Sequence, residues 1–274
     1  MFAWVFGHFC AIAVGISLGL LGGGGAILAV PILVYVLGVG VKGAIATSLV
    51  SVGTVSAIGT FLHWKKDSVR FDIALLFAPA AMLGAYLGAL VASLSWVSES
   101  FQFLCFGVMM LLVGLLMIAK SRPKTQRAYT GFSSPQDSDN TEISYVPSSR
   151  ALVRQAMILG EGMGIGILTG FVGIGGGFAI VPALVLLTGI PIKQAVGTSL
   201  FVIALKSITG FMGYLGQTPI RWDLVFSFTV AASLGTLIGS YLNKFIKAKT
   251  LQTGFGYFVL FSAVLVLFAQ LSLP

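Results

Sequence analysis

Two glycine-rich runs could bind an anion through the backbone alone. The glycines are Gly22, Gly23, Gly24 and Gly25 in the first run, and Gly173, Gly175, Gly176 and Gly177 in the second. Each glycine destabilises a helix by roughly 1 kcal/mol relative to Ala, so each run predicts a helix break. The helix that follows begins with free N–H groups and partial positive charge, which suit an anion. The alternative is that the glycines only permit close helix packing. No Gly-Lys-Ser/Thr follows, which excludes a Walker-type phosphate loop.

A proline and then a Thr-Ser pair follow each glycine run. These residues are Pro31, Thr47 and Ser48 after the first run, and Pro182, Thr198 and Ser199 after the second. The prolines either reflect the preference for proline near a helix start or kink the helix and shape a cavity. The hydroxyl groups either hydrogen-bond an oxyanion or cap and bond back to their own helix. We include all six among the candidate substrate-binding residues.

Lys206 and Glu161 are the two ionisable residues in the middle of apolar segments. Such residues face the interior of a membrane protein and are functional candidates by default. Lys206 is a candidate ligand for an anionic substrate, and Glu161 is a candidate for proton coupling. The alternative is a structural pair between the two side chains.

No arrangement of residues typical of an enzyme or a metal site occurs in the sequence. There is no His-Glu-x-x-His, no Ser-x-x-Lys with partners and no paired acids, and Cys10 and Cys105 stand alone. We therefore expect no enzymatic activity, no bound metal and no cofactor.

The chemistry-bearing residues occur twice because the chain is a duplication with an offset of 151 residues. Each half contains the glycine-rich run, the proline and the segment Lys-x-Ala-x-x-Thr-Ser-Leu in the same order, and the offset holds without a gap. Arg70 and Asp72 correspond to Arg221 and Asp223. Lys206 and Glu161 break this symmetry, since their counterparts are Val55 and Cys10. One transport pathway built from two similar halves would account for this pattern.

Composition places these residues in a membrane. Hydrophobic residues make up 57% of the 274 residues and charged residues only 9%, whereas a soluble domain has about 25% charged residues. Apolar runs long enough to span a bilayer recur along the chain, which predicts an all-α polytopic membrane protein. The net charge of +8 fits cations gathered in loops on one side of the membrane, so we expect a lipid bilayer as partner and no nucleic acid.

The apolar segments divide the chain into two repeats joined by a polar linker. Residues 1–119 form the first repeat, 120–150 the linker and 151–274 the second repeat. Five segments are expected in each repeat. Those of the first are at about 2–21, 26–37, 44–62, 71–94 and 101–119, and those of the second are at about 151–172, 178–188, 195–215, 223–242 and 253–271. The second segment of each repeat is a short broken helix after the glycine run.

Five crossings in each repeat would place the two repeats in opposite orientations, as in an inverted repeat. The charges favour this arrangement with the linker and the loop 244–249 on the cytoplasmic side and both termini outside, because only Lys42 and Arg221 of the loop cations then lie outside. If the short second segments are merely re-entrant, the repeats become parallel.

The paired Gly-rich and proline motif, the Lys-x-Ala-x-x-Thr-Ser-Leu segments and the two-fold layout together resemble the TauE/SafE sulfite-exporter family. This resemblance covers nearly the whole chain apart from the linker. It implies a multi-pass carrier in the bacterial inner membrane for small sulfur-containing anions such as sulfite or organosulfonates, without a nucleotide or a metal.

The sequence therefore predicts a secondary transporter of a small anion, coupled to protons or to the membrane potential, with export favoured over uptake. The alternatives are an anion channel and a membrane assembly or scaffold protein that transports nothing. The anion, the coupling ion, the direction and the oligomeric state stay open.

Overall fold

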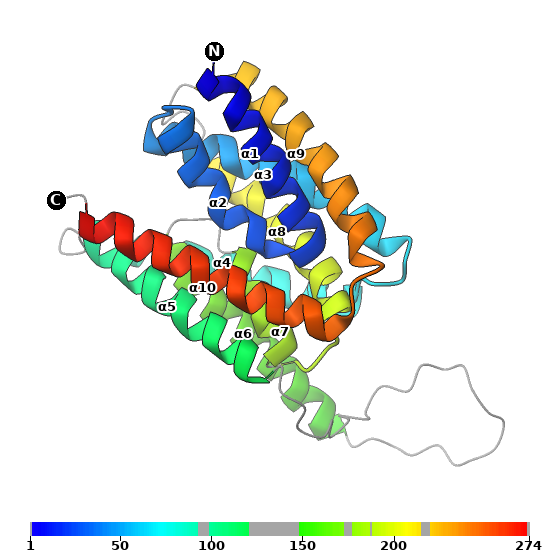
Figure 1. Cartoon of the computed structure of the whole chain (residues 1–274). Coiled ribbons are helices and arrows are strands. Elements are labelled where there is room, and N and C mark those ends of the chain that lie inside the picture. Colours follow the sequence, from blue (N-terminus) through cyan, green and yellow to red (C-terminus); the bar gives the residue numbers. More distant parts are fainter. Residues whose placement is uncertain are drawn as a thin grey trace.

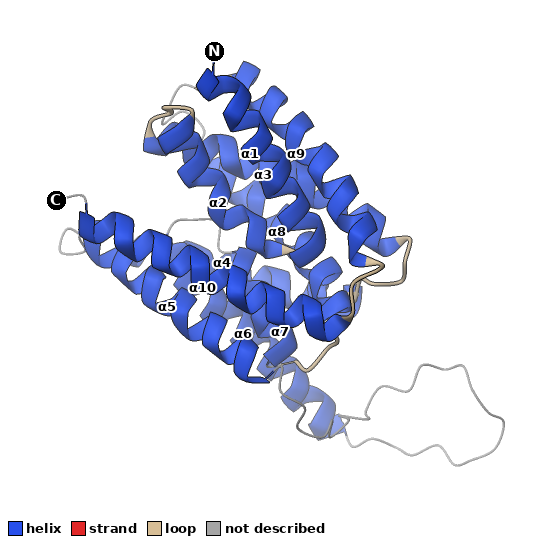
Figure 2. Cartoon of the chain, in the orientation of Figure 1, coloured by secondary structure: helices blue, strands red, loops and turns tan. Residues whose placement is uncertain are grey.

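The computed structural model describes residues 2–92, 99–120, 148–172, 177–186, 188–214 and 220–272, and these form helices joined by loops (Figure 1; Figure 2). The elements of the first half are α1 (Phe2–Leu21), η1 (Gly23–Gly25), α2 (Ala26–Pro31), η2 (Ile32–Val36), α3 (Val41–Trp64), α4 (Phe71–Ala92) and α5 (Glu99–Lys120). Those of the second half are α6 (Ser148–Val172), α7 (Gly177–Leu186), α8 (Ile192–Tyr214), α9 (Trp222–Asn243) and α10 (Ala248–Ser272).

The prediction of a polytopic helical membrane protein is confirmed. Within the described residues, α1, α3, α4, α8 and α9 are long and apolar enough to cross a membrane. Two shorter apolar helical stretches, Gly23–Val36 and Gly107–Ala119, accompany them. Most of the predicted linker falls outside the described residues, while α6 starts at Ser148, within the range predicted for the linker.

The second segment of the first half is more irregular than the short helix that the sequence predicts. It begins as the 3₁₀-helix η1, continues as the six-residue helix α2 and ends as the π-helix η2. Pro31 is the last residue of α2, and its missing N–H removes one i→i−4 hydrogen bond. A π-type stretch next to such a position relieves the mismatch. In the second half, α7 is a single helix of 10 residues that contains Pro182.

Each half packs its helices against the other half. The most extensive contacts join α1 with α9, α4 with α6, α3 with α8 and α5 with α10. Figure 1 shows α1 beside α9 and α5 beside α10. The first helix of each half therefore pairs with the fourth helix of the other half, and the third and fifth helices pair with their own counterparts.

Glycines allow two of these pairs to approach backbone to backbone. A Cβ atom on Gly15 would meet the backbone of Ala232, and one on Gly19 would meet the backbone of Thr236. In the same way, a Cβ atom on Gly84 would meet Met163, and one on Gly88 would meet Ile167. Within each pair, the residue numbers of the contacts rise together along the two helices. Therefore α1 runs parallel to α9, and α4 runs parallel to α6.

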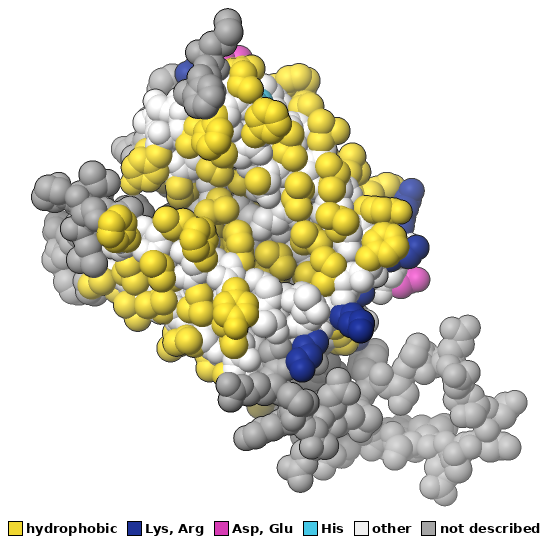
Figure 3. Space-filling model, viewed as in Figure 1, with side chains coloured by type: hydrophobic (Ala, Val, Ile, Leu, Met, Phe, Trp, Pro, Cys, Tyr) yellow, Lys and Arg dark blue, Asp and Glu magenta, His cyan; other side chains and the backbone are white. Residues whose placement is uncertain are grey.

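The pair α3 and α8 runs antiparallel. A Cβ atom on Gly53 would meet the Ser207 side chain, and one on Gly59 would meet the Leu200 side chain. The position on α8 therefore falls as the position on α3 rises. In Figure 3, hydrophobic side chains cover most of the visible face, and most of the visible Lys and Arg side chains gather at one end of it.

Candidate functional site

The first glycine break lies against the start of α7 in the interior. A Cβ atom on Gly177, the first residue of α7, would lie 3.2 Å from the Gly23 Cα atom and 2.8 Å from Ile203 of α8. Gly177 and Gly23 are both buried. Gly173, Gly175 and Gly176 lie outside the described residues, so the described contact is between the first break and the start of α7.

Gly22 makes the turn from α1 into the first break. Its φ of 72° lies in the left-handed region, which a residue with a Cβ atom adopts only at a cost of roughly 1–2 kcal/mol. A Cβ atom there would also lie 2.5 Å from the Ser199 Oγ atom. The turn is therefore pressed against α8 of the other half and needs glycine for two separate reasons.

The other glycines of the first run have different surroundings. A Cβ atom on Gly25 would meet the Val14 carbonyl oxygen and the Leu18 backbone of α1. The packing role of glycine therefore applies at this position. Gly24 faces α10, where a Cβ atom would make ordinary contacts of 3.4–3.5 Å with Phe258, Leu21 and Phe255.

The two prolines lie inside their helices. Pro31 is the sixth and last residue of α2, directly before the π-helix η2, and Pro182 is buried in α7 as its sixth residue. Both positions lie beyond the first helical turn, where proline is preferred. Of the two interpretations, the geometry favours a local distortion that shapes the helix.

The structure separates the two Thr-Ser pairs. Thr47 and Ser48 lie in the first two turns of α3, and Thr198 and Ser199 lie in the first two turns of α8. Because these helices are antiparallel, the pairs lie at opposite ends, roughly 15 Å or more apart at 1.5 Å per residue. All four side chains are buried. One small anion cannot contact both pairs in this conformation.

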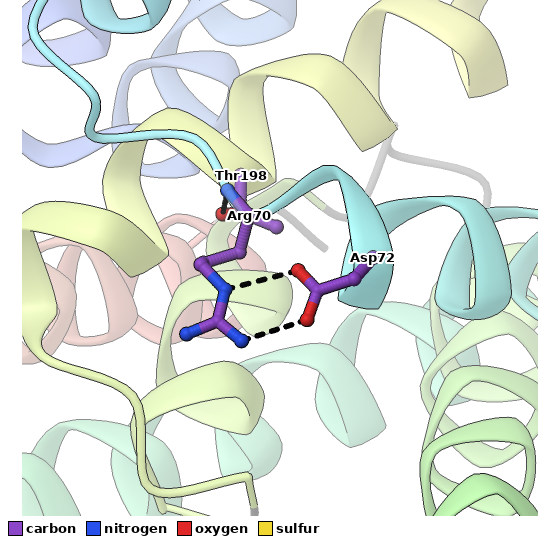
Figure 4. A network of polar contacts seen from close by, with 3 residues as sticks. All are labelled: Arg70, Asp72 and Thr198. Atoms are coloured by element: carbon purple, nitrogen blue, oxygen red, sulfur yellow. Dashed lines mark hydrogen bonds and ion pairs between the residues drawn. The ribbon is translucent and has the colours of Figure 1, made fainter. Parts of the chain in front are cut away.

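The second pair has defined hydrogen bonds. The Thr198 Oγ1 atom accepts a hydrogen bond of 3.0 Å from the Arg70 backbone N–H. The Ser199 hydroxyl donates a hydrogen bond of 2.8 Å to the Val196 carbonyl oxygen of its own helix. Figure 4 shows Thr198 above the Arg70–Asp72 pair, in which the guanidinium donates two hydrogen bonds of 2.9 and 2.7 Å to the carboxylate. This pairing raises the pKa of Arg70 above its ordinary value.

Lys206 lies on α8, one turn beyond Ile203, which contacts Gly177. Its ammonium group donates a hydrogen bond of 2.6 Å to the Thr169 hydroxyl of α6. Thr169 is 2% exposed and is the fourth residue before the second glycine run. Lys206 therefore brings a cation close to the start of the second break.

Glu161 does not pair with Lys206. Eight residues of α6, roughly 12 Å, separate Glu161 from Thr169, and the ion pairs among the described residues are Arg70–Asp72 and Arg221–Asp223. The Glu161 Oε2 atom is buried, with no hydrogen-bond partner in the described part of the chain. The structural pair between Lys206 and Glu161 is therefore not formed in this conformation.

A set of buried polar groups near the first break was missed by the sequence reasoning. His63 is 1% exposed, and its Nε2–H donates to the Gly19 carbonyl oxygen at 3.2 Å. Asn243 donates to the Leu20 carbonyl oxygen at 2.7 Å, and Lys66 donates to the Ser240 carbonyl oxygen at 2.8 Å. We call these three contacts the polar tethers; they join the ends of α1, α3 and α9.

A signal for the polar tethers was present in the duplication. The counterpart of His63 is Tyr214, that of Lys66 is Gln217 and that of Asn243 is Ala92. The halves therefore differ at these helix ends as well as at the intramembrane charges. Across the described residues, no group of three or more His, Cys, Asp or Glu could hold a metal ion.

The fold and this site define a polytopic helical membrane protein with a buried glycine break beside the start of α7. Residues 8–266 match the family described as "Sulfite exporter TauE/SafE". The chain therefore belongs to the TauE/SafE family of membrane transporters.

Named relatives agree with this assignment. A "Probable membrane transporter protein" of Xylella fastidiosa (strain Temecula1 / ATCC 700964) is 34% identical over 257 residues, which cover 93% of this chain and 91% of the relative. The "Probable membrane transporter protein YunE" of Bacillus subtilis (strain 168) is 32% identical over 245 residues, 85% of each chain. No solved structure matches this chain.

Proposed function

We propose that this protein is a secondary carrier that exports a small sulfur-containing anion, such as sulfite or an organosulfonate, across the bacterial inner membrane. The proton gradient or the membrane potential drives the transport. The substrate class and the direction follow the family's description as sulfite exporters. The relatives' names support transport without specifying a substrate.

The observation that carries the proposal is the contact between the first glycine break and the start of α7, with Lys206 nearby. Broken backbone in a membrane is tolerated where it is buried in protein or lines a cavity, and carriers place discontinuous helices at the substrate site. An ionisable residue inside the membrane is a functional candidate, and the Lys206 ammonium group is held by the Thr169 hydroxyl close to this contact. Its positive charge would attract an anion bound there.

We further propose that the halves form an inverted repeat with the linker in the cytoplasm. The His63–Gly19 contact places the ends of α3 and α1 together, so α1 and α3 run in one direction and α4 returns. Since α4 and α6 run parallel, α6 is antiparallel to α1, its counterpart in the repeat. This direction supports the inverted arrangement over the parallel one.

Flux measurements in proteoliposomes test the carrier proposal. We expect the purified protein to accumulate sulfite above its equilibrium level when a proton gradient or a membrane potential is imposed. Flux that only reaches equilibrium would indicate a channel, and no flux of sulfite, sulfonates or other small anions would favour a scaffold protein. The variant Lys206→Met should reduce this flux. Lys249→Gln, which removes a charge from an exposed position, serves as its control.

Cysteine labelling tests the topology. Cysteines placed at Thr130 in the linker and at Lys247 in the loop before α10 should both react only with a reagent that reaches the cytoplasmic side. A cysteine near the N-terminus should react from the outside. Labelling of positions 130 and 247 from opposite sides would overturn the inverted arrangement.

A further inference from the structure

Two loops from different halves meet at one end of the helices. The loop after α3 carries Lys65 and Lys66, and the loop after α9 carries Lys244. The Lys66 ammonium reaches across and donates to the Ser240 carbonyl oxygen in the last turn of α9 at 2.8 Å. Lys66 is therefore held in place on α9, close to where Lys244 follows that helix.

Lys66 and Lys244 are two like charges that lie near each other. Partial burial lowers the pKa of Lys66, and the positive charge of Lys244 lowers it further. The ion pairs formed by the described residues involve Arg70 with Asp72 and Arg221 with Asp223. No carboxylate among those residues therefore neutralises Lys66 or Lys244 by direct contact, so an anion placed between them would relieve their repulsion.

Exposed aromatic side chains lie close to these two lysines in the chain. Trp64 precedes the first loop and is 55% exposed, and Tyr241 and Phe245 flank Lys244 with 61% and 64% exposure. Figure 3 shows Lys and Arg side chains gathered at one edge of the visible hydrophobic surface. Aromatic and basic residues at such an edge are typical of the level of lipid headgroups.

We propose that Lys66 and Lys244 together bind the phosphate of an anionic phospholipid. Two ammonium groups donate charge-assisted hydrogen bonds to the phosphate oxygens, and the acyl chains lie along the exposed apolar side chains of α9. Those side chains include Leu234, Leu237 and Ile238, which are 46–53% exposed. The phosphate joins the loop of the first half to the loop of the second half, so the lipid acts as a clamp between them.

Lys65 provides a matched control in the same loop. Its ammonium group lies 4.5 Å from the centre of the Phe61 ring on its own helix, so it is directed to an aromatic side chain. Lys65→Gln removes the same unit of charge as Lys66→Gln. A difference between the two variants therefore reports on position and not on net charge.

Native mass spectrometry and thermal unfolding in a neutral detergent test the proposal. The probes are phosphatidylglycerol, phosphatidylcholine and inorganic phosphate. We expect the parent protein and the Lys65→Gln variant to retain and be stabilised by phosphatidylglycerol more than by phosphatidylcholine. Each of Lys66→Gln and Lys244→Gln should weaken phosphatidylglycerol retention by about fivefold, the effect of one basic residue near an anionic surface.

Three results would overturn the proposal. They are an undiminished preference for phosphatidylglycerol in the Lys66→Gln/Lys244→Gln variant, an equal loss in Lys65→Gln, and equal stabilisation by inorganic phosphate, which would indicate a site for free anions. If the double Gln variant does not fold, Lys66→Arg/Lys244→Arg keeps the charges and should keep the preference; its loss counts against the proposal. These measurements do not depend on transport, so the lipid site and the carrier proposal can fail separately.

Discussion

The Arg-x-Asp motif occurs once in each half, and its two copies have different surroundings. Arg70 and Asp72 approach to 2.7 Å with side chains 27% and 48% exposed, whereas Arg221 and Asp223 approach to 3.3 Å with side chains 58% and 69% exposed. The Arg70 backbone also donates to Thr198 of the other half. The first copy thus connects the two halves, and the second copy is a surface pair.

The polar tethers extend the same contrast. They hold the ends of α1, α3 and α9 together near the first glycine break, and their residues have counterparts without the same donors, such as Ala92 for Asn243. The residues that form the polar tethers are therefore not repeated by the duplication. A carrier that opens alternately to two sides needs a difference between its two ends to favour one state.

Lys206→Met is expected to have the largest effect on transport. Removing the ammonium group takes away the charge that we assign to the anion, so sulfite affinity should fall by at least about tenfold, about 1.4 kcal/mol. Lys206→Arg should keep part of the affinity. The variant at the counterpart position, Val55→Met, should keep anion affinity close to that of the parent.

Variants of Glu161 distinguish between a substrate-binding role and a structural role of Lys206. Glu161→Gln should leave anion affinity intact and change the pH dependence of transport. If the double variant Lys206→Met/Glu161→Gln binds the anion like the parent protein, Lys206 does not hold the substrate. Binding and thermal stability are to be measured on both single variants and on the double variant.

Gly22→Ala should reduce stability and transport more than Gly24→Ala. The left-handed φ at Gly22 alone costs roughly 1–2 kcal/mol with Ala, and its Cβ atom would displace the Ser199 hydroxyl. Gly24 has room for a Cβ atom beside Phe255 and Phe258. Unfolding and flux measurements on the two variants decide this, and equal losses would show that the turn at Gly22 has no special requirement.

Thr198→Val is expected to destabilise the protein by roughly 1 kcal/mol, because the half-buried Arg70 amide loses its acceptor. The expected accompanying change is faster proteolysis or hydrogen exchange in the loop 65–70. Thr47→Val is the matched change in the other half. Equal exchange rates at the loop in both variants would contradict the proposed connection between the halves.

The smallest effect is expected at the arginines. Arg70→Gln should reduce stability by about 0.5 kcal/mol, the range of an exposed ion pair, and added salt should diminish the difference. Arg221→Gln should leave the midpoint of unfolding unchanged, because that pair is longer and more exposed. A larger loss at Arg221 than at Arg70 would reverse the ranking of the two copies.

The sequence predicted the helical architecture because apolar runs and the duplication are properties of composition and order. It also predicts a helix break at Gly22 and makes Lys206 a candidate, because a run of four glycines disfavours a helix and a lysine inside a membrane helix has a high energetic cost. Their role in binding a substrate stays a prediction. It could not place Thr47 and Ser48 far from Thr198 and Ser199, because the antiparallel packing of α3 on α8 depends on contacts distant in the chain. The asymmetry at His63 and Asn243 is visible in the duplication, but their partners are not, since these are backbone carbonyls that any residue could provide.

The close contact of α1 with α9 has a consequence for how the protein is made. During synthesis, α1 enters the bilayer long before α9 exists. The surface of α1 that carries Gly15 and Gly19 must therefore first face lipid or the helices that are made before α9. The same holds for α4 until α6 follows. Assembly of the first half therefore waits for the second, and a truncated chain that ends before α9 leaves α1 without its partner and open to quality-control proteases.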